Sequence, residues 1–201
     1  MKPILFNTEM VRAILDGRKT VTRRVVKQSI TDKFVLSQDG KLLGSFNADH
    51  PEWGIYPTID DAPYRPSNIL YVRETFFECR GHFYYKADGK HEGLARLGVY
   101  FKWQPSIHMP CKAARIFLRV TDVRVERLQD INDDEALKEG FGYFGAVDWI
   151  KSPFYDFRDT WDTLLKPKDR ALYGWVANPW VWVIEFERVS REEANHEQNK
   201  N

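Results

Sequence analysis

Apolar residues near the start of the chain recur at the spacing of a helix. The four residues that form this apolar face are Met10, Val11, Ile14 and Leu15. Asn7 and Thr8 precede them as candidate N-caps, and Gly17 follows at the place where a left-handed residue ends a helix. The pattern therefore predicts a helix that ends at Gly17.

Stretches of apolar and β-branched residues predict several strands. They cover residues 2–6, 20–26, 69–72, 82–86, 99–103, 114–128 and 179–189. In the longest of them, 114–128, the apolar residues change face near Thr121-Asp122, so we expect a bulge or a sharp bend there. Bends of this kind are what small, strongly curved barrels require.

Two further helices are predicted in the second half of the chain. Asn132 caps an acidic first turn, and that helix ends at Glu139-Gly140. The other helix begins at Ser152-Pro153, with proline at its first position. Its apolar face carries Phe154, Phe157, Trp161 and Leu164.

The order of these elements predicts an α+β fold in which helices flank a small, curved, mainly antiparallel β-barrel. We expect one domain over residues 1–190, with loop insertions at about 28–66 and 87–98. Within the first loop, a hairpin is possible around Asp39-Gly40. Residues 191–201 lack apolar character, and we expect a disordered polar tail there.

Composition narrows the range of possible functions. The chain has 201 residues and a net charge of +1, which argues against a protein that binds polyanions over its whole surface but permits a local basic patch. Such a patch lies between Arg12 and Lys27. The two cysteines and five histidines show no ligand-like spacing, so we expect no structural metal. No signal peptide or membrane-spanning stretch is visible, and we expect a cytoplasmic protein, with a monomer favoured.

Residues 14–24, with the sequence ILDGRKTVTRR, resemble the signature of the ASCH domain, a member of the PUA-like barrel superfamily associated with RNA. Further stretches that resemble ASCH sequences are LYVRET at 70–75, LQDI at 128–131, ALKEG at 136–140 and NPWVWVIEF at 178–186. The layout also resembles the longer ASCH proteins of phages and prophages. The resemblance implies a single ASCH-like domain that acts on RNA or on modified nucleosides.

The general ASCH signature, Gly-x-Lys-x-x-Glu-x-Arg, matches Gly17, Lys19 and Arg24 but meets Thr22 where glutamate is expected. Short bacterial ASCH proteins that hydrolyse N4-acetylcytidine are similar here, because they carry threonine at this position. This resemblance implies Lys19, Thr22 and Glu139 as catalytic residues, with no cofactor and no metal. As substrate-binding residues we predict Arg18, Arg23, Arg24, Arg73 and Glu74.

Two mechanisms fit the same three residues. In the first, Thr22 attacks the acyl carbon, Lys19 accepts its proton, and Glu139 protonates the leaving nitrogen. In the second, Glu139 activates a water molecule while charged Lys19 stabilises the oxyanion. Lys19 and Thr22 would face opposite ways in a regular strand, so we expect Lys19 to belong to the turn after Gly17.

Other functions remain open on the sequence. An RNA-binding or ribonuclease-like module would hold phosphates with its basic patch and stack single-stranded RNA on Tyr71, Trp53 or Trp103. A phage-associated accessory protein would act through its aromatic loops. The structural interpretations are that Lys19 is solvated, that Thr22 merely favours a strand, and that Arg73-Glu74 forms an ordinary salt bridge.

Overall fold

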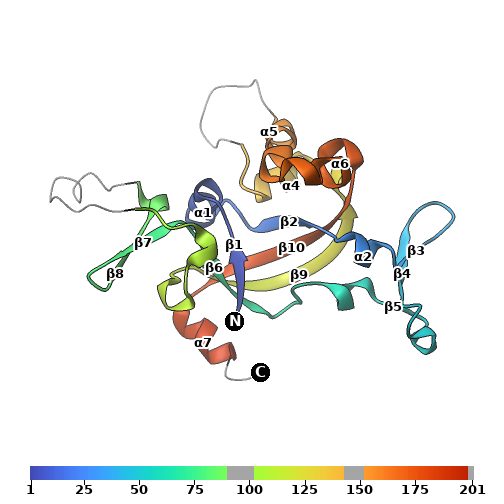
Figure 1. Cartoon of the computed structure of the whole chain (residues 1–201), viewed down its shortest axis with the longest axis horizontal. Coiled ribbons are helices and arrows are strands. Elements are labelled where there is room, and N and C mark those ends of the chain that lie inside the picture. The colour runs from blue at the N-terminus through green and yellow to red at the C-terminus, as the bar shows by residue number, and fades with distance from the viewer. Residues whose placement is uncertain (90–101, 143–151, 199–201) are drawn as a thin grey trace. The chain divides into compact units, whose positions relative to one another are not determined.

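The computed structural model describes residues 1–89, 102–142 and 152–198 (Figure 1). The chain forms two compact units, each assembled from segments that are far apart in the sequence. Unit 1 comprises Met1–Thr20, Ser67–Val120 and Phe186–Asn201, and unit 2 comprises Val21–Pro66 and Thr121–Glu185. The α+β class is confirmed, whereas the extent of a single domain over residues 1–190 stays a prediction.

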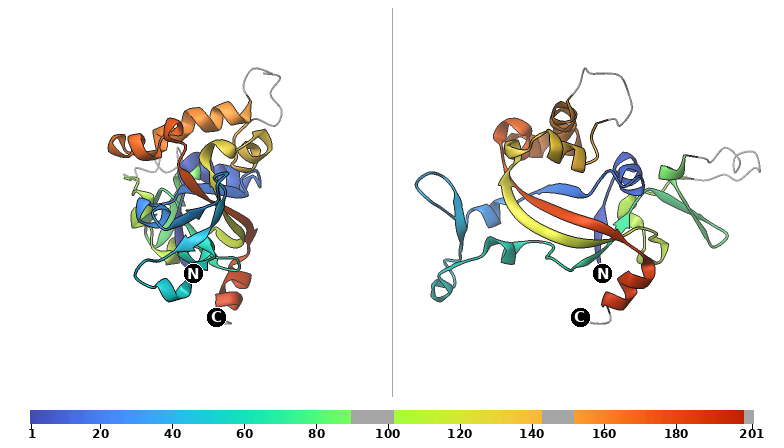
Figure 2. Two further views of the ribbon diagram at one scale, coloured as in Figure 1. Left: turned by 90° about the vertical axis from the view of Figure 1, so that its right-hand side faces the viewer. Right: turned by 180° about the vertical axis from the view of Figure 1, so that it is seen from behind.

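The largest sheet has the strand order β1-β6-β9-β10-β2. Its strands are β1 (Lys2–Leu5), β2 (Val21–Val25), β6 (Ile69–Arg73), β9 (Phe117–Arg127) and β10 (Trp180–Val189). Strand β1 pairs in parallel with β6, whereas β6 pairs with β9 and β10 pairs with β2 in antiparallel register. Figure 2 shows β9 in yellow beside β10 in red. In the described residues β1 and β2 are the two edges, so this sheet is not a closed barrel.

Unit 1 surrounds its part of this sheet with short elements. These are helix α1 (Thr8–Leu15), strand β7 (Phe76–Cys79), strand β8 (His82–Tyr85) and helix α7 (Arg191–Gln198). Strands β7 and β8 form an antiparallel hairpin. A hydrophobic cluster buries Ile69, Phe76, Met109, Phe117 and Ala194, so apolar side chains from β6, β7, β9 and α7 share one core.

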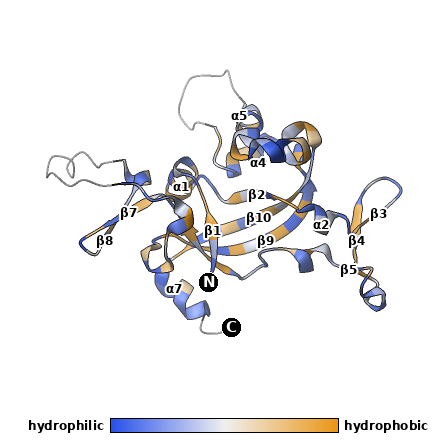
Figure 3. Cartoon of the chain, viewed as in Figure 1, coloured by the Kyte–Doolittle hydropathy of each residue, from blue (hydrophilic) through white to orange (hydrophobic). Residues whose placement is uncertain are grey.

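The described residues of unit 2 form a smaller sheet and four α-helices. The sheet has the order β3-β4-β5, formed by β3 (Phe34–Leu36), β4 (Leu42–Phe46) and β5 (Ile55–Tyr56). Figure 3 shows hydrophobic colour on strand β4 of this sheet. The helices are α2 (Gln28–Thr31), α4 (Asp133–Lys138), α5 (Pro153–Trp161) and α6 (Arg170–Tyr173). Their core joins Val21 and Val183 of the large sheet to Ala136, Phe157 and Trp161.

Several local predictions are confirmed. Asn7 accepts a hydrogen bond from the Met10 amide at 2.8 Å, and Gly17 has a φ of +74°, as expected for the two ends of α1. Asn132 caps α4 by accepting from the Glu135 amide at 3.0 Å. The hairpin around Asp39-Gly40 is present as β3 and β4. Short polar side chains and left-handed glycines thus end these elements where the sequence predicted.

Other predictions need correction. The expected disordered tail instead begins with α7, because Ala194 is completely buried and supplies an apolar anchor that the polar composition concealed. Leu164 is 47% exposed rather than part of the core, since α5 has ended before it. In strand β9, by contrast, Thr121 and Asp122 are both exposed between buried Val120 and Val123, so the buried face changes where the sequence predicted, and the bulge itself stays a prediction. The predicted strand at 99–103 lies largely outside the described residues.

In the part of the chain that the structure describes, no helix is both long enough and apolar enough to cross a bilayer.

Candidate active site

Lys19 follows the turn that ends α1. The amides of Arg18 and Lys19 both donate to the carbonyl oxygen of Ala13, at 2.9 and 3.0 Å. This tight turn after Gly17 ends before β2, which begins at Val21, so Lys19 lies outside the strand, as expected. Its side chain is only 2% exposed, and its Nζ lies 5.6 Å from the centre of the Phe6 ring. The interpretation of Lys19 as a solvated lysine is therefore wrong.

Arg18 has a different environment from its neighbour. Its guanidinium is 3.1 Å from the carboxylate of Asp16, and about a third of its side chain is exposed. Because Arg18 and Lys19 follow each other on the turn, one cation lies at the surface of unit 1 while the next is buried.

Strand β2 places Thr22 and Arg23 on opposite faces, because successive side chains of a strand alternate. Thr22 stands opposite Ile184 of β10 and is 1% exposed. Arg23 stands opposite Val183 and is 2% exposed. Burial on both faces is consistent with the position of β2 next to the central part of β10.

Arg23 is the centre of a buried ionic network in unit 2. Its Nη2 lies 2.8 Å from Glu135 and 3.4 Å from Glu126, and its Nη1 lies 3.5 Å from Glu139. The guanidinium also lies 6.0 Å from the centre of the Phe157 ring. In the described part of the chain, Arg23 Nε is buried and has no hydrogen-bond partner. Three carboxylates around one guanidinium give this region an excess of negative charge.

A second arginine offsets only part of that excess, because it also contacts two further carboxylates, Asp122 and Glu185. Arg124 of β9 contacts Glu126 and Glu185 at 2.5 Å and Glu135 at 3.2 Å. Because Glu126 and Glu135 are shared between Arg124 and Arg23, the two arginines act on common carboxylates. Arg23 links Glu139 to these shared carboxylates, because its Nη1 lies 3.5 Å from Glu139.

Glu139 forms the C-terminal cap of α4. Its amide donates to the carbonyl of Glu135, and Gly140 follows with a φ of +91°. The carboxylate side chain is 3% exposed. A glutamate before a terminal glycine is ordinarily exposed, so the ordinary structural interpretation of this residue is also wrong.

Arg24 lies on the same face of β2 as Thr22 and is partly exposed. Loss of hydration lowers its pKa from the ordinary value, and the negative charges of Glu139 and of ionised Tyr64 act in the opposite direction. Glu139 thus interacts electrostatically with both arginines of β2.

Arg73 and Glu74 belong to unit 1 and have separate partners. Glu74 is 1% exposed and accepts two hydrogen bonds from Arg115, at 2.8 and 3.0 Å. Burial raises the pKa of Glu74, and Arg115 opposes that shift. Arg73 donates to the carbonyl of Met109 at 2.9 Å. The predicted pairing of Arg73 with Glu74 is therefore replaced by contacts with two other residues.

The structure brings part of the predicted site together. In unit 2, Arg23 contacts Glu139, and β2 also carries Thr22 and Arg24. Lys19, Arg18, Arg73 and Glu74 belong to unit 1. The convergence of the proposed catalytic residues, Lys19, Thr22 and Glu139, stays a prediction, whereas the burial of each of them is an observation.

Sequence reasoning missed several members of these networks. Glu135 and Glu139 are four residues apart, a spacing that places both carboxylates on one face of a helix, and this signal was available. Arg115 as partner of Glu74, and Arg124 as partner of Glu185, follow only from strand pairing and packing. Within residues 1–89, 102–142 and 152–198, no group of three or more His, Cys, Asp or Glu side chains is arranged to hold a metal ion.

Comparison with known proteins gives little further information. No protein-family model matches the chain, and no curated protein matches it. Among solved structures, it is similar to the crystal structure of protein EF3133 from Enterococcus faecalis V583, described by the family name DUF984. That similarity has a TM-score of 0.42 at 11% identity and covers 94% of this chain and 82% of the other.

Proposed function

We propose that this chain is an ASCH-like hydrolase that cleaves the amide bond of N4-acylated cytosine nucleosides without a metal. The observation that carries the proposal is the burial of three polar residues that the sequence resemblance selects. Lys19, Thr22 and Glu139 are 2%, 1% and 3% exposed. The ASCH assignment, and the interpretation of the five-stranded sheet as part of a curved barrel, rest on the resemblance and belong to the same proposal.

Burial matters because each of these residues has a commonplace alternative role. Lysine after a helix, and glutamate before a terminal glycine, are ordinarily solvated. Burying their charged groups is unfavourable unless other groups compensate. Such residues are candidates for catalysis, because burial and neighbouring charges give them the properties that acid-base chemistry needs.

The contact between Arg23 and Glu139 favours one of the two routes. An ion-paired Glu139 is a carboxylate, the form that accepts a proton from water. The resulting hydroxide attacks the acyl carbon, and the ammonium of Lys19 stabilises the oxyanion. The tetrahedral intermediate then expels the N4 amine, which takes the proton from Glu139. The products are the free cytosine nucleoside and a carboxylic acid.

In the other route, Thr22 transfers its proton to neutral Lys19 while its oxygen attacks the acyl carbon. Protonated Glu139 supplies the proton for the leaving amine, and water then hydrolyses the acyl-threonine ester. This route requires Glu139 to begin as the acid, which the ion pair with Arg23 does not favour.

The direct test is release of cytidine from N4-acetylcytidine, followed by chromatography in the presence of a chelator. We expect turnover by the wild type and a loss of at least about 100-fold for Lys19→Ala. Lys41→Ala is a suitable control, because the Lys41 side chain is 82% exposed. Absence of release by the wild type, or undiminished release by Lys19→Ala, would contradict the proposal.

RNA binding is a second candidate, supported by one surface feature of unit 2. Trp53 is 57% exposed and stacks on His50, with ring centres 4.3 Å apart. Exposed aromatic rings of this kind stack on unpaired bases. Against it, Lys19 and Arg23 are too buried to hold phosphates at the surface. RNA affinity that falls steeply with ionic strength would favour this candidate over the hydrolase.

A further inference from the structure

Unit 2 contains a cavity of about 320 Å³, and none of the proposed catalytic residues lines it. It is lined by side chains that follow β2, from α2 and α6, and from the ends of β9 and β10. The lining residues include Val26, Gln28, Arg127, Leu172, Tyr173 and Trp180. Its volume is near the lower end of the range of about 300–1,000 Å³ that small-ligand sites occupy, so a single small molecule fits it.

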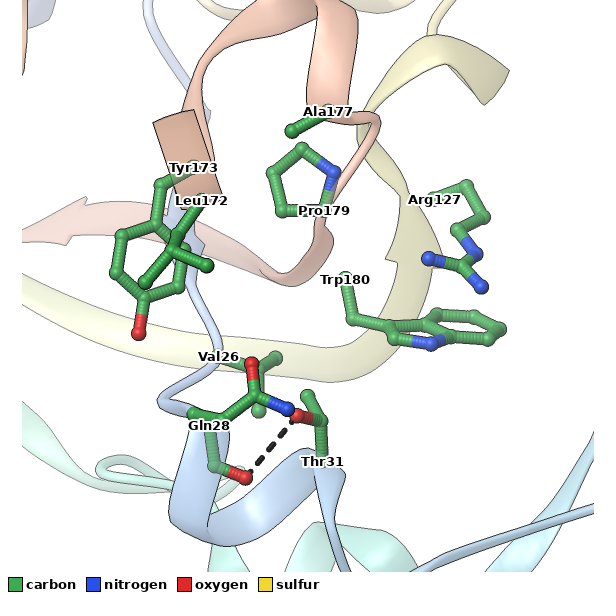
Figure 4. A pocket seen from close by; sticks show the side chains of 9 residues that line it. All are labelled: Val26, Gln28, Thr31, Arg127, Leu172, Tyr173, Ala177, Pro179 and Trp180. Carbon is green, nitrogen blue, oxygen red and sulfur yellow. Dashed lines mark hydrogen bonds between the residues drawn. The ribbon is translucent and has the colours of Figure 1, made fainter. Parts of the chain in front are cut away.

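The cavity has two aromatic walls. Figure 4 shows the rings of Tyr173 and Trp180 on opposite sides, with Val26 and Gln28 between them. The guanidinium of Arg127 lies over the Trp180 ring, 4.1 Å from its centre. Phe34 also packs on Trp180, with ring centres 5.6 Å apart and planes at 77°. Tyr173 is therefore the ring that offers a stacking surface to a planar ligand.

Arg127 also brings a positive charge to the cavity. Its Nη1 donates to the carbonyl of Asn178 at 3.1 Å, and its backbone amide donates to the Asp130 carboxylate at 3.2 Å. Among the described residues its guanidinium has no ion pair, whereas Arg23 and Arg124 each contact several carboxylates. The described lining of the cavity contains this one cation and no carboxylate. An arginine in this setting suits a phosphate or another anion, which it can bind through two donors.

The segment that supplies Tyr173 adds further positive charge. Residues 166–170 contain Lys166, Lys168 and Arg170, and all three are exposed. Arg170 begins the short helix α6 that ends at Tyr173. An anionic ligand is therefore attracted toward this side of unit 2 before it makes specific contacts.

The wall of the cavity is held in place by several hydrogen bonds. Trp161 Nε1 donates to the carbonyl of Tyr173 at 2.8 Å, and Asp162 accepts from the Trp175 amide at 2.7 Å. The side chain of Gln129 donates to the carbonyl of Trp175 at 2.8 Å, and the backbone amide of Gln129 donates to the Asn178 side chain at 2.9 Å. A site that is already ordered loses little conformational entropy when it binds a ligand.

We infer that this cavity binds a nucleotide, with the base against the Tyr173 ring and the phosphate at Arg127. The Gln28 side chain, whose Nε2 also donates to Asp32 at 2.8 Å, offers a hydrogen bond to the edge of the base. None of the proposed catalytic residues lines the cavity, so the inference does not depend on the proposed hydrolase. The nucleotide is either free or a unit of a single strand, and the chemistry of recognition is the same.

The test is calorimetric titration of the full chain with the four ribonucleoside 5′-monophosphates, the matching nucleosides and inorganic phosphate. We expect at least one monophosphate to bind more tightly than both its nucleoside and phosphate. Arg127→Gln should weaken that binding about 10-fold or more, since hydrogen bonds to charged groups are strong. Tyr173→Leu should weaken the binding of both the monophosphate and its nucleoside by about 10-fold, because a stacking surface is lost.

Arg188→Gln is the matched control, because Arg188 belongs to unit 1 and donates a 3.5 Å hydrogen bond to the Leu15 carbonyl. Thermal melts of all variants verify folding. A hexanucleotide titration distinguishes the sources: tighter binding than the monophosphate, with the same dependence on Arg127, identifies a strand, and equal or weaker binding identifies a free nucleotide. No monophosphate binding at millimolar concentration, or equal binding by folded Arg127→Gln and the wild type, would overturn the inference.

Discussion

The Nη1 atom of Arg23 lies 3.5 Å from a carboxylate oxygen of Glu139, and the side chains of both residues are almost completely buried. This contact connects strand β2 to the end of helix α4. It also joins a residue predicted to bind substrate to one predicted to be catalytic. Since Arg23 contacts Glu135 and Glu126 as well, we infer that it positions the carboxylate and does not itself touch the substrate.

Replacing Arg23 by methionine should destabilise the protein strongly. The change keeps an apolar side chain of similar length but leaves three carboxylates without their shared cation. Breaking a buried ion pair from one side costs about 3–5 kcal/mol of unfolding free energy. Lys41→Met removes an exposed pair with Asp39 and should cost less than about 1 kcal/mol. Urea denaturation measures both, and similar losses in the two variants would contradict the role of Arg23.

Substitutions of Thr22 and Glu139 distinguish the two proposed routes of hydrolysis. We expect Glu139→Gln to reduce the rate of cytidine release by about 10²–10⁴-fold, because a general base is lost. Thr22→Val should reduce it far less, since water is the nucleophile in the favoured route. The opposite pattern, with Thr22→Val inactive and Thr22→Ser active, would establish threonine as the nucleophile instead.

Glu74 should make stability depend on pH. Burial raises its pKa above the ordinary value of 4.5. The folded state therefore holds the proton more tightly than the unfolded state does. The stabilising contribution is fully present below the unfolded pKa, about 4.3, and is lost as the pH rises through the folded pKa. Unfolding free energies measured across this range should fall more in the wild type than in Glu74→Gln.

Substitution of Arg115 gives a second test of the pH dependence attributed to Glu74. Its two hydrogen bonds favour the charged form of Glu74. Removing them in Arg115→Gln should raise the pKa of Glu74 further, so stability should be lost over a range that extends to higher pH. Identical pH profiles for the wild type, Glu74→Gln and Arg115→Gln would show that Glu74 does not contribute.

Helix α7 offers a test of the C-terminal segment. Ala194 is completely buried, whereas its neighbour Asn195 is exposed. Ala194→Leu should therefore lower the unfolding free energy by about 1–3 kcal/mol through overpacking. Asn195→Leu should change it by no more than about 0.5 kcal/mol. Equal effects at the two positions would mean that α7 does not pack against unit 1 in solution.

Local signals in the sequence predicted the ends of several elements correctly. Asn7 and Asn132 begin helices, and Gly17 and Gly140 follow helix ends with positive φ. The strands at 69–72 and 179–189 agree with β6 and β10 to within a residue. These features depend on backbone conformation and on contacts between residues a few positions apart, which the order of residues specifies directly.

The sequence predicted which residue types could form the candidate site, but not the environment of each side chain. The run from Gly17 to Arg24 indicated a cationic, hydroxyl-containing site, but four neighbouring side chains have different environments. Arg18 is partly exposed, Lys19 is buried in unit 1, Arg23 is surrounded by carboxylates, and Arg24 is partly exposed on the other face of β2. Charge and propensity do not distinguish these environments.

The sequence by itself thus determined where several helices and strands begin and end, and which residues could carry chemistry. Only the tertiary structure decided that Lys19 and Glu139 are buried, that Arg23 contacts Glu139, and that Glu74 is held by Arg115. The two partners in the Arg23–Glu139 contact are 116 positions apart. Their proximity depends on how strands pair and helices pack, and interactions over such separations leave no local pattern in the sequence.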